Sequence, residues 1–181
     1  MGIENRGQKI KLLVLDVDGV LTSGQIIFGP EGELMKKFHA QDGLGITLAH
    51  KAGLNIAIIT GRESQMVSLR SAELSIADVY QGSMNKIQAL EELMAKYGLT
   101  QEQIAYAGDD LNDLPVMIRV GLPCAVANAV PEVKQHAQLI TKQTGGNGAV
   151  REIIEYILKA QGKWDSIITA YLQGGRIETK Q

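Results

Sequence analysis

The chain has 181 residues, of which 45% are hydrophobic and 21% charged, and its formal net charge at pH 7 is −2. This length and composition are typical of one soluble globular domain, so we expect residues 1–181 to form a single domain with a sizeable core. An aromatic content of 4% and the lack of net positive charge argue against a nucleic-acid-binding protein. The single cysteine, Cys124, cannot form an internal disulfide, and three scattered histidines predict no zinc site.

Nothing in the sequence predicts contact with a membrane. Residues 1–9 are polar and lack a signal-peptide core, and no apolar run approaches the length of a membrane span. We therefore expect a cytoplasmic protein.

The predicted elements alternate between strands and helices. An apolar run that begins at residue 11 predicts a buried strand ending at Asp16, and a β-hairpin insertion follows at about 25–38 around a Gly-Pro-Glu-Gly turn. Further strands are predicted at 55–60, 77–80, 103–107, 122–126 and 138–140, and helices at 42–52, 63–73, 84–97, 112–119 and 149–160. This order predicts an α/β fold with a doubly wound parallel sheet. The polar tail, about 163–181, is expected to fray.

Two carboxylates follow the first predicted strand. Asp16 and Asp18 share an Asp-Val-Asp-Gly segment at the carboxyl end of the strand, where open α/β sheets keep their sites. Two acids this close repel one another, and one of them holds a proton unless a cation is present. The pair therefore predicts a divalent cation, a catalytic proton, or both.

Other polar groups follow later strands, and parallel strands bring their carboxyl ends to one edge of a sheet. These groups are Thr60-Gly61-Arg62, Lys86 near the start of a helix, and Gly108-Asp109-Asp110-Leu111-Asn112-Asp113. Taken singly, each has an ordinary structural explanation, such as a helix cap or a solvated lysine. Together, and in this order, they favour a catalytic site.

The combination supplies the parts that phosphoryl transfer requires. We expect Asp16 to be the nucleophile that forms an aspartyl phosphate, and Asp18 to be the general acid and then the base. Asp16 and Asp109, with a backbone carbonyl near Asp18, are expected to hold Mg²⁺. Thr60 and Lys86 would neutralise the phosphate oxygens. The acidic loop after the strand at 103–107 would support the site through Asp110, Asn112 and Asp113.

These segments resemble the motifs of the haloacid dehalogenase superfamily of Mg²⁺-dependent phosphohydrolases. Asp16 to Thr22, Thr60, Lys86 and Gly108 to Asp113 match its four motifs in order. An acid at the position of Asp18 is typical of its phosphohydrolases and mutases, whereas its ATPases have Thr there and its dehalogenases lack the acid. The intervals between the motifs are too short for a cap domain, so the resemblance implies a capless member with a Rossmann-like core.

Within the superfamily, residues 8–165 resemble the family of 3-deoxy-D-manno-octulosonate (KDO) 8-phosphate phosphatases, enzymes of lipopolysaccharide synthesis. Further matching segments include 41–46, 57–62, 80–82 and 145–152. The resemblance implies a homotetramer that assembles through the hairpin, with a C-terminal tail that can cover a neighbour's site. It also implies that Arg62, beside Gly61, and Arg70 meet the anionic sugar acid. Asn147 departs from the family, in which Arg is frequent at this position.

Three alternatives remain open at this point. A sister phosphatase for a nine-carbon keto-sugar acid 9-phosphate would have the same catalytic motifs. A phosphoacceptor switch also uses Asp, Thr and Lys around Mg²⁺, although it accepts phosphate later in the chain than Asp16. A structural α/β interaction module would require the acidic cluster to be accidental.

Overall fold

The computed structural model describes residues 3–174, with side chains from residue 6 onward. A six-stranded sheet in the order β5-β4-β1-β6-β7-β8 forms its centre, and every pair of neighbouring strands is parallel. The strands are β1 (Leu12–Leu15), β4 (Asn55–Ile59), β5 (Asp78–Tyr80), β6 (Ile104–Gly108), β7 (Leu122–Ala125) and β8 (Leu139–Ile140). Because the order runs outward from β1 in both directions, the structure confirms the predicted doubly wound α/β fold.

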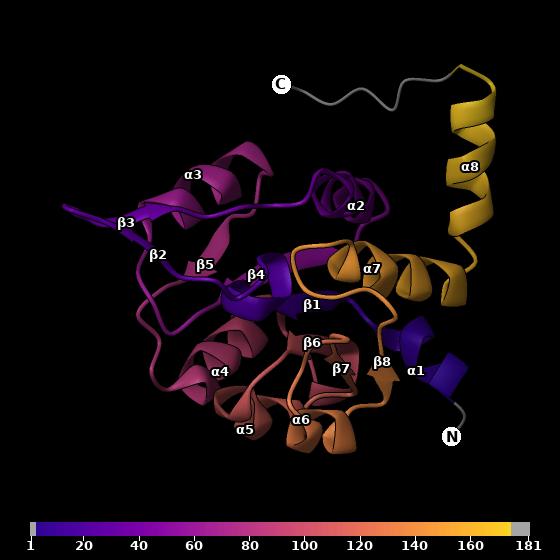
Figure 1. The fold of residues 1–181 in the computed structure, drawn as a ribbon. Coiled ribbons are helices and arrows are strands. Elements are labelled where there is room, and N and C mark those ends of the chain that lie inside the picture. Colours follow the sequence, from indigo (N-terminus) through magenta and orange to yellow (C-terminus); the bar gives the residue numbers. More distant parts are fainter. Residues whose placement is uncertain (1–2, 175–181) are drawn as a thin grey trace.

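Helices cover both faces of the sheet (Figure 1). One face carries α2 (Ala40–Lys51), α3 (Gln65–Glu73) and α7 (Ala149–Ala160), and the other carries α4 (Lys86–Tyr97), α5 (Leu114–Met117) and α6 (Pro131–His136). The short α1 (Ile3–Lys9) lies against α7, and α8 (Trp164–Leu172) projects from the C-terminal end of α7. This covering explains why all four residues of β1 are fully buried and apolar.

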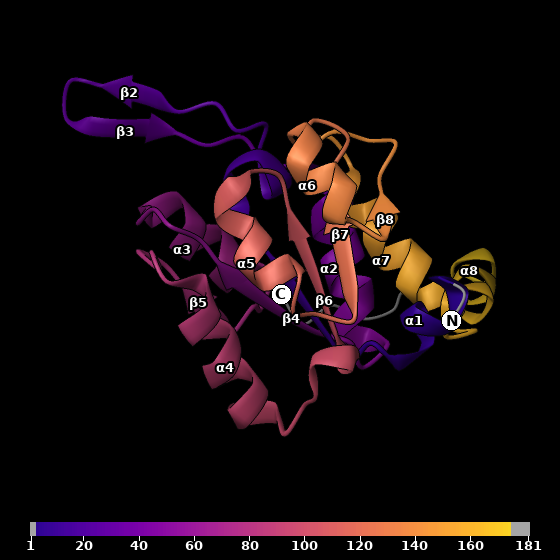
Figure 2. The same ribbon diagram turned by 90° about the horizontal axis from the view of Figure 1, so that it is seen from below.

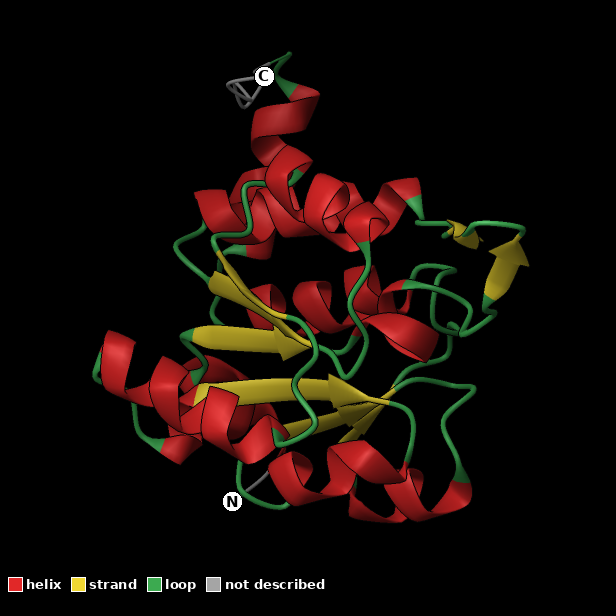
Figure 3. Cartoon of the chain, turned by 90° about the vertical axis from the view of Figure 1, so that its left-hand side faces the viewer, coloured by secondary structure: helices red, strands yellow, loops and turns green. Residues whose placement is uncertain are grey.

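The carboxyl ends of the strands define one side of the molecule, toward which the strand arrows point in Figure 3. The turn η1 (Val17–Leu21) follows β1 there, and the short turn η3 (Leu111–Asp113) lies just beyond β6. A further turn, η2 (Gln101–Gln103), precedes β6 at the opposite side. Since β1 and β6 are paired neighbours, with Leu15 opposite Ala107, the turns that follow them lie close together.

The predicted hairpin is present as β2 (Ile27–Gly29) and β3 (Gly32–Met35), which pair antiparallel. It projects from the body of the molecule (Figure 2). Apart from η1, the segment between β1 and β4 contains only this hairpin and α2, in agreement with the capless architecture.

The structure differs from the sequence-based expectation in the short helices. α1, α6 and α8 had not been predicted, and the helix predicted at 112–119 is the η3 turn followed by α5. α8 is ordered as a helix because its first residue, Trp164, is only 9% exposed and lies beside Arg151 and Lys159 of α7. The first part of the tail is thus helical, and the fraying predicted for its polar ending stays a prediction, since residues 175–181 lie outside the described residues. Among the described residues, no helix combines the length and hydrophobicity needed to cross a membrane.

The buried carboxylate of Asp42 joins α2 to α7, two helices that cover the same face of the sheet. Asp42, near the start of α2, is 2% exposed and accepts hydrogen bonds from the backbone N–H groups of Gly148 (3.3 Å) and Arg151 (2.7 Å) at the start of α7. A carboxylate at a helix N-terminus satisfies N–H groups that have no partner within the helix.

We expect the D42A substitution to lower the free energy of unfolding by about 2 kcal/mol, because it leaves the buried N–H of Gly148 and the partly buried N–H of Arg151 without an acceptor. D42N, which retains one acceptor oxygen, should lose less. Urea denaturation of both variants measures the effect, with E91A, at an exposed acid of α4, as the control. A D42A curve that superimposes on the E91A curve would contradict this role.

Candidate active site

The turn after β1 brings its first acid to the sheet edge. The backbone N–H of Asp16 still bonds to the carbonyl of Ala107 in β6 (3.1 Å), and its side chain is buried. Gly19 then turns the chain with a φ of +93°, a conformation that favours glycine. A Cβ atom at this position would lie 1.9 Å from Oδ2 of Asp109. Only glycine therefore allows the acidic loops after β1 and β6 to approach this closely.

A buried ammonium group joins the carboxylates. Lys86 is the first residue of α4 and is 4% exposed, and its Nζ lies 3.1 Å from Oδ1 of Asp16 and 2.7 Å from Oδ1 of Asp113. Nζ also donates to the hydroxyl of Tyr106 (3.2 Å). The sequence required the stem of Lys86 to reach back to the sheet edge, and the structure has this arrangement. Burial opposes the charge of Lys86, but Asp16 and Asp113 outweigh it and raise the pKa of the ammonium.

Asp113 fixes the loop after β6. It is fully buried, and its Oδ1 accepts from the Tyr106 hydroxyl (2.6 Å) as well as from Lys86. Its Oδ2 accepts from the backbone N–H groups of Asp109 (2.8 Å) and Asp110 (3.2 Å). With both oxygens engaged in this way, Asp113 orients the loop that carries Asp109.

Three carboxylates form a group that could hold a cation. Ligand atoms of Asp16, Asp109 and Asp113 all lie within 4.8 Å of one another. Burial, with Asp113 as the next cause, raises the pKa of Asp16 to about 6, and burial with Asp113 and Asp16 raises that of Asp109 to about 7. Buried acids that oppose each other's ionisation are suited to a hard divalent cation with oxygen ligands. Because the oxygens of Asp113 already accept hydrogen bonds, Asp16 and Asp109 are the better placed ligands.

Asp18 lies apart from this group of three and has partners of its own. Its side chain is 19% exposed, its Oδ1 lies 2.5 Å from Nζ of Lys36, and its Oδ2 lies 3.8 Å from Nε of Arg62. Arg62, which follows β4, is 47% exposed and so can still meet a ligand. Arg62 thus lies next to Asp18, and its contact with the sugar acid stays a prediction.

The remaining predicted residues lie in the loops that follow β4 and β6. Thr60 is buried at the end of β4, where its backbone bonds to Tyr80 (2.9 Å) and Ser83 (3.0 Å), and Gly61 beside it has open space where a side chain would extend. Asp110 and Asn112 are exposed in the loop after β6.

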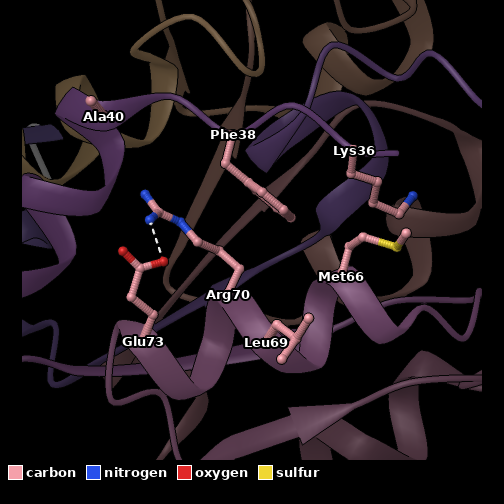
Figure 4. Close-up of a pocket in the computed structure, with 7 residues that line it drawn as sticks. All are labelled: Lys36, Phe38, Ala40, Met66, Leu69, Arg70 and Glu73. Atoms are coloured by element: carbon pink, nitrogen blue, oxygen red, sulfur yellow. Dashed lines mark hydrogen bonds and ion pairs between the residues drawn. The ribbon is translucent and has the colours of Figure 1, made fainter. Parts of the chain in front are cut away.

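Arg70 is not brought to the acidic group. It forms an ion pair with Glu73 (2.8 Å) and lies over the ring of Phe38, in a cavity of about 460 Å³ between α3 and the segment that follows the hairpin (Figure 4).

Sequence reasoning missed three residues at the site. Tyr106 gives its hydroxyl to Asp113, Lys36 holds Asp18, and Asn128 bridges the turn after β1 to the glycine-rich loop, donating to the carbonyl of Gly19 (3.1 Å) and accepting from the N–H of Gly145 (2.6 Å). The only available signal was a tyrosine within an otherwise apolar buried strand, since a buried hydroxyl requires a partner.

Comparison with known proteins places this chain among phosphatases of one superfamily. Residues 59–154 match the family model described as haloacid dehalogenase-like hydrolase. The chain is 47% identical over 160 residues to the Escherichia coli (strain K12) protein named 3-deoxy-D-manno-octulosonate 8-phosphate phosphatase KdsC, covering 88% of this chain and 85% of that protein.

Solved structures agree. The phosphatase of the same name from Moraxella catarrhalis, in complex with magnesium ion, phosphate ion and KDO, has a TM-score of 0.91 and 44% identity and covers 93% of this chain and 97% of that one. The cobalt-bound deoxy-D-mannose-octulosonate 8-phosphate phosphatase from Haemophilus influenzae has a TM-score of 0.89 and 40% identity, with 92% and 99% covered. The resemblance seen in the sequence is thereby confirmed, and this chain belongs to the haloacid dehalogenase-like hydrolases.

Proposed function

We propose that this chain is a Mg²⁺-dependent phosphatase that hydrolyses KDO 8-phosphate to KDO and phosphate, through an aspartyl phosphate on Asp16, in lipopolysaccharide synthesis. The observation that carries the proposal is the buried group of Asp16, Lys86, Asp109 and Asp113 at the carboxyl ends of β1 and β6. The names of the relatives support the substrate, since proteins up to 47% identical are named for this reaction.

Asp16 acts as the nucleophile. It is held by its backbone bond to β6 and by Lys86, so its carboxylate attacks phosphorus from a fixed position. Mg²⁺ held by Asp16 and Asp109 would neutralise negative charge on the phosphoryl group. Lys86 contributes a second fixed positive charge, and Thr60 a hydroxyl at the end of the neighbouring strand.

Asp18 transfers the protons. It donates one to the oxygen of the leaving sugar as the phosphorus–oxygen bond breaks, and it then removes one from the water that hydrolyses the aspartyl phosphate. Its position two residues from Asp16, with a side chain that is partly exposed, supports contact with both the leaving group and water.

Arg62 is the residue best placed to bind the carboxylate of the sugar acid, with Gly61 leaving room beside it. Arg70 can contribute only if it exchanges its present partner, Glu73, for the substrate. A nine-carbon keto-sugar acid phosphate is the second candidate substrate, because one such contact discriminates by only a few kcal/mol.

The hairpin supports assembly into a homotetramer. Phe28, Leu34 and Met35 are 65%, 58% and 43% exposed on an element that projects from the body. Exposed apolar side chains that gather in this way mark protein–protein contact surfaces.

The decisive experiment measures phosphate release from KDO 8-phosphate, a nine-carbon acid 9-phosphate, glucose 6-phosphate and p-nitrophenyl phosphate, with Mg²⁺ and with EDTA. We expect turnover only with Mg²⁺ and highest kcat/KM for the eight-carbon acid. The D16N variant should remain folded and lose activity by more than about a thousandfold, because the amide is a poor nucleophile. Preference for the nine-carbon acid would change the substrate and keep the mechanism, whereas no release from any compound would contradict the proposal.

Mg²⁺ affinity should rise with pH. Since the pKa of Asp16 is about 6 and that of Asp109 about 7 without the metal, protons compete for the ligands below these values. We expect binding to tighten about tenfold or more between about pH 5.5 and 7.5, measured by calorimetry, and the dependence to flatten in D109N. Equal affinity at both pH values would refute this linkage.

The metal-free protein offers a second readout of the same groups. Their folded-state pKa values exceed the ordinary value of 3.8, so the folded state takes up these protons at higher pH than the unfolded chain does. The ionised carboxylates of Asp16 and Asp109 destabilise the folded state, and this destabilisation is complete above about pH 7. The free energy of unfolding should therefore rise as the pH falls from about 7 toward 5.

Replacement of Leu34 by Asp should dissociate the oligomer, because it places a charge on the apolar surface of the hairpin. Light scattering after gel filtration measures the mass. I118D, at a residue 63% exposed beyond α5, is the matched control and should leave the mass unchanged. A wild-type protein that is monomeric at micromolar concentration would contradict the assembly.

A further inference from the structure

Lys36 is buried at a place where lysines are usually solvated. It follows directly after β3, at the base of a hairpin that projects into solvent, yet its side chain is only 1% exposed. Its Nζ lies 2.5 Å from Oδ1 of Asp18 and 3.0 Å from Oε1 of Glu33. Burying an ammonium group is unfavourable unless it is paired, so the two carboxylates define where Nζ lies.

The surrounding contacts hold Lys36 in place. Glu33 in β3 also accepts a hydrogen bond from the hydroxyl of Ser64, which precedes α3. Arg62 lies 5.9 Å from the centre of the Phe28 ring in β2. The base of the hairpin is thus connected to the loop after β4 by side chains from both of its strands, and Lys36 extends this connection to Asp18.

Lys36 also lines the cavity next to α3. Figure 4 shows Lys36 beside Met66 at one end of the cavity and the Arg70–Glu73 pair at the other.

The two oxygens of Asp18 have unequal surroundings. Oδ1 forms the short bond with Lys36, whereas Oδ2 lies 3.8 Å from Arg62, too far for a hydrogen bond, and accepts none from the residues that the structure describes. A carboxyl group held through one oxygen by a buried ammonium has a fixed orientation, and its other oxygen is the one open to a further partner.

We propose that Lys36 is a positioning residue for Asp18: by binding Oδ1 it directs Oδ2 to the proton transfer with the leaving alcohol. The role rests on the proposed function. When the Asp16–phosphorus bond forms and the bond from phosphorus to the sugar oxygen breaks, Oδ2 delivers its proton to that oxygen, and Asp18 becomes the carboxylate that later accepts a proton from water. Lys36 keeps its own protons throughout.

The test uses the dependence on the leaving group. p-Nitrophenolate leaves without being protonated, whereas the alcohol of KDO 8-phosphate requires a proton, and kcat/KM reports the steps up to departure of the leaving group. In K36M we expect kcat/KM to fall about tenfold or more for KDO 8-phosphate and by less than about threefold for p-nitrophenyl phosphate. K36R, which keeps a cation, should recover part of the loss on the sugar phosphate.

K37M is the matched control, because it removes the neighbouring cation, which is exposed, and leaves the pair with Asp18 intact. Its ratio of the two kcat/KM values should equal that of the wild type. The mass and thermal unfolding of each variant are measured in parallel. If K36M does not fold, the ratio of the two kcat/KM values in K36R tests the positioning role, because a displaced cation must still alter that ratio.

Equal losses on both substrates, or a K36M ratio like that of K37M, would overturn the positioning role while leaving the phosphatase assignment intact. A wild type that releases phosphate from neither compound would overturn the proposed function, and this role with it.

Discussion

The ion pairs of Lys86 are the interaction on which the site depends. Three carboxylates meet at the ends of β1 and β6, and they would repel one another if no positive charge were buried with them. Lys86 reaches Asp16 and Asp113 from the first turn of α4, and Tyr106 completes its hydrogen bonds. The same ammonium therefore stabilises the acidic cluster in the folded protein and leaves a positive charge where a phosphoryl group would bind.

Close approach of the backbone makes this arrangement possible. Gly19 allows the turn after β1 to lie against Asp109, and a Cβ at Gly108 would lie 2.5 Å from that of Asp113. Gly145 approaches the carbonyl of Gly19 in the same manner, with Asn128 bonded to both residues. Three loops that follow different strands are thus held together at one edge of a rigid sheet, which fixes the site to the geometry that phosphoryl transfer requires.

The hairpin adds a second layer of organisation. It exposes the apolar side chains of Phe28, Leu34 and Met35, whereas Lys36 and Glu33 join it to Asp18 and Ser64. The orientation of Asp18 and the position of the hairpin are for this reason coupled. Assembly through the hairpin, as proposed above, would therefore act on the orientation of Asp18.

The sequence by itself determined the sheet, its main helices, the hairpin and the identity of the acidic loops, because buried parallel strands and glycine-rich turns have local patterns. It did not reveal α1, α6 or α8, whose few turns are stabilised by tertiary packing rather than by local periodicity. Nor could it show that Tyr106 bonds to Asp113, that Lys36 pairs with Asp18 or that Arg70 pairs with Glu73. The partner of a long polar side chain is decided by burial and by distances between segments remote in sequence, and only the tertiary structure provides these.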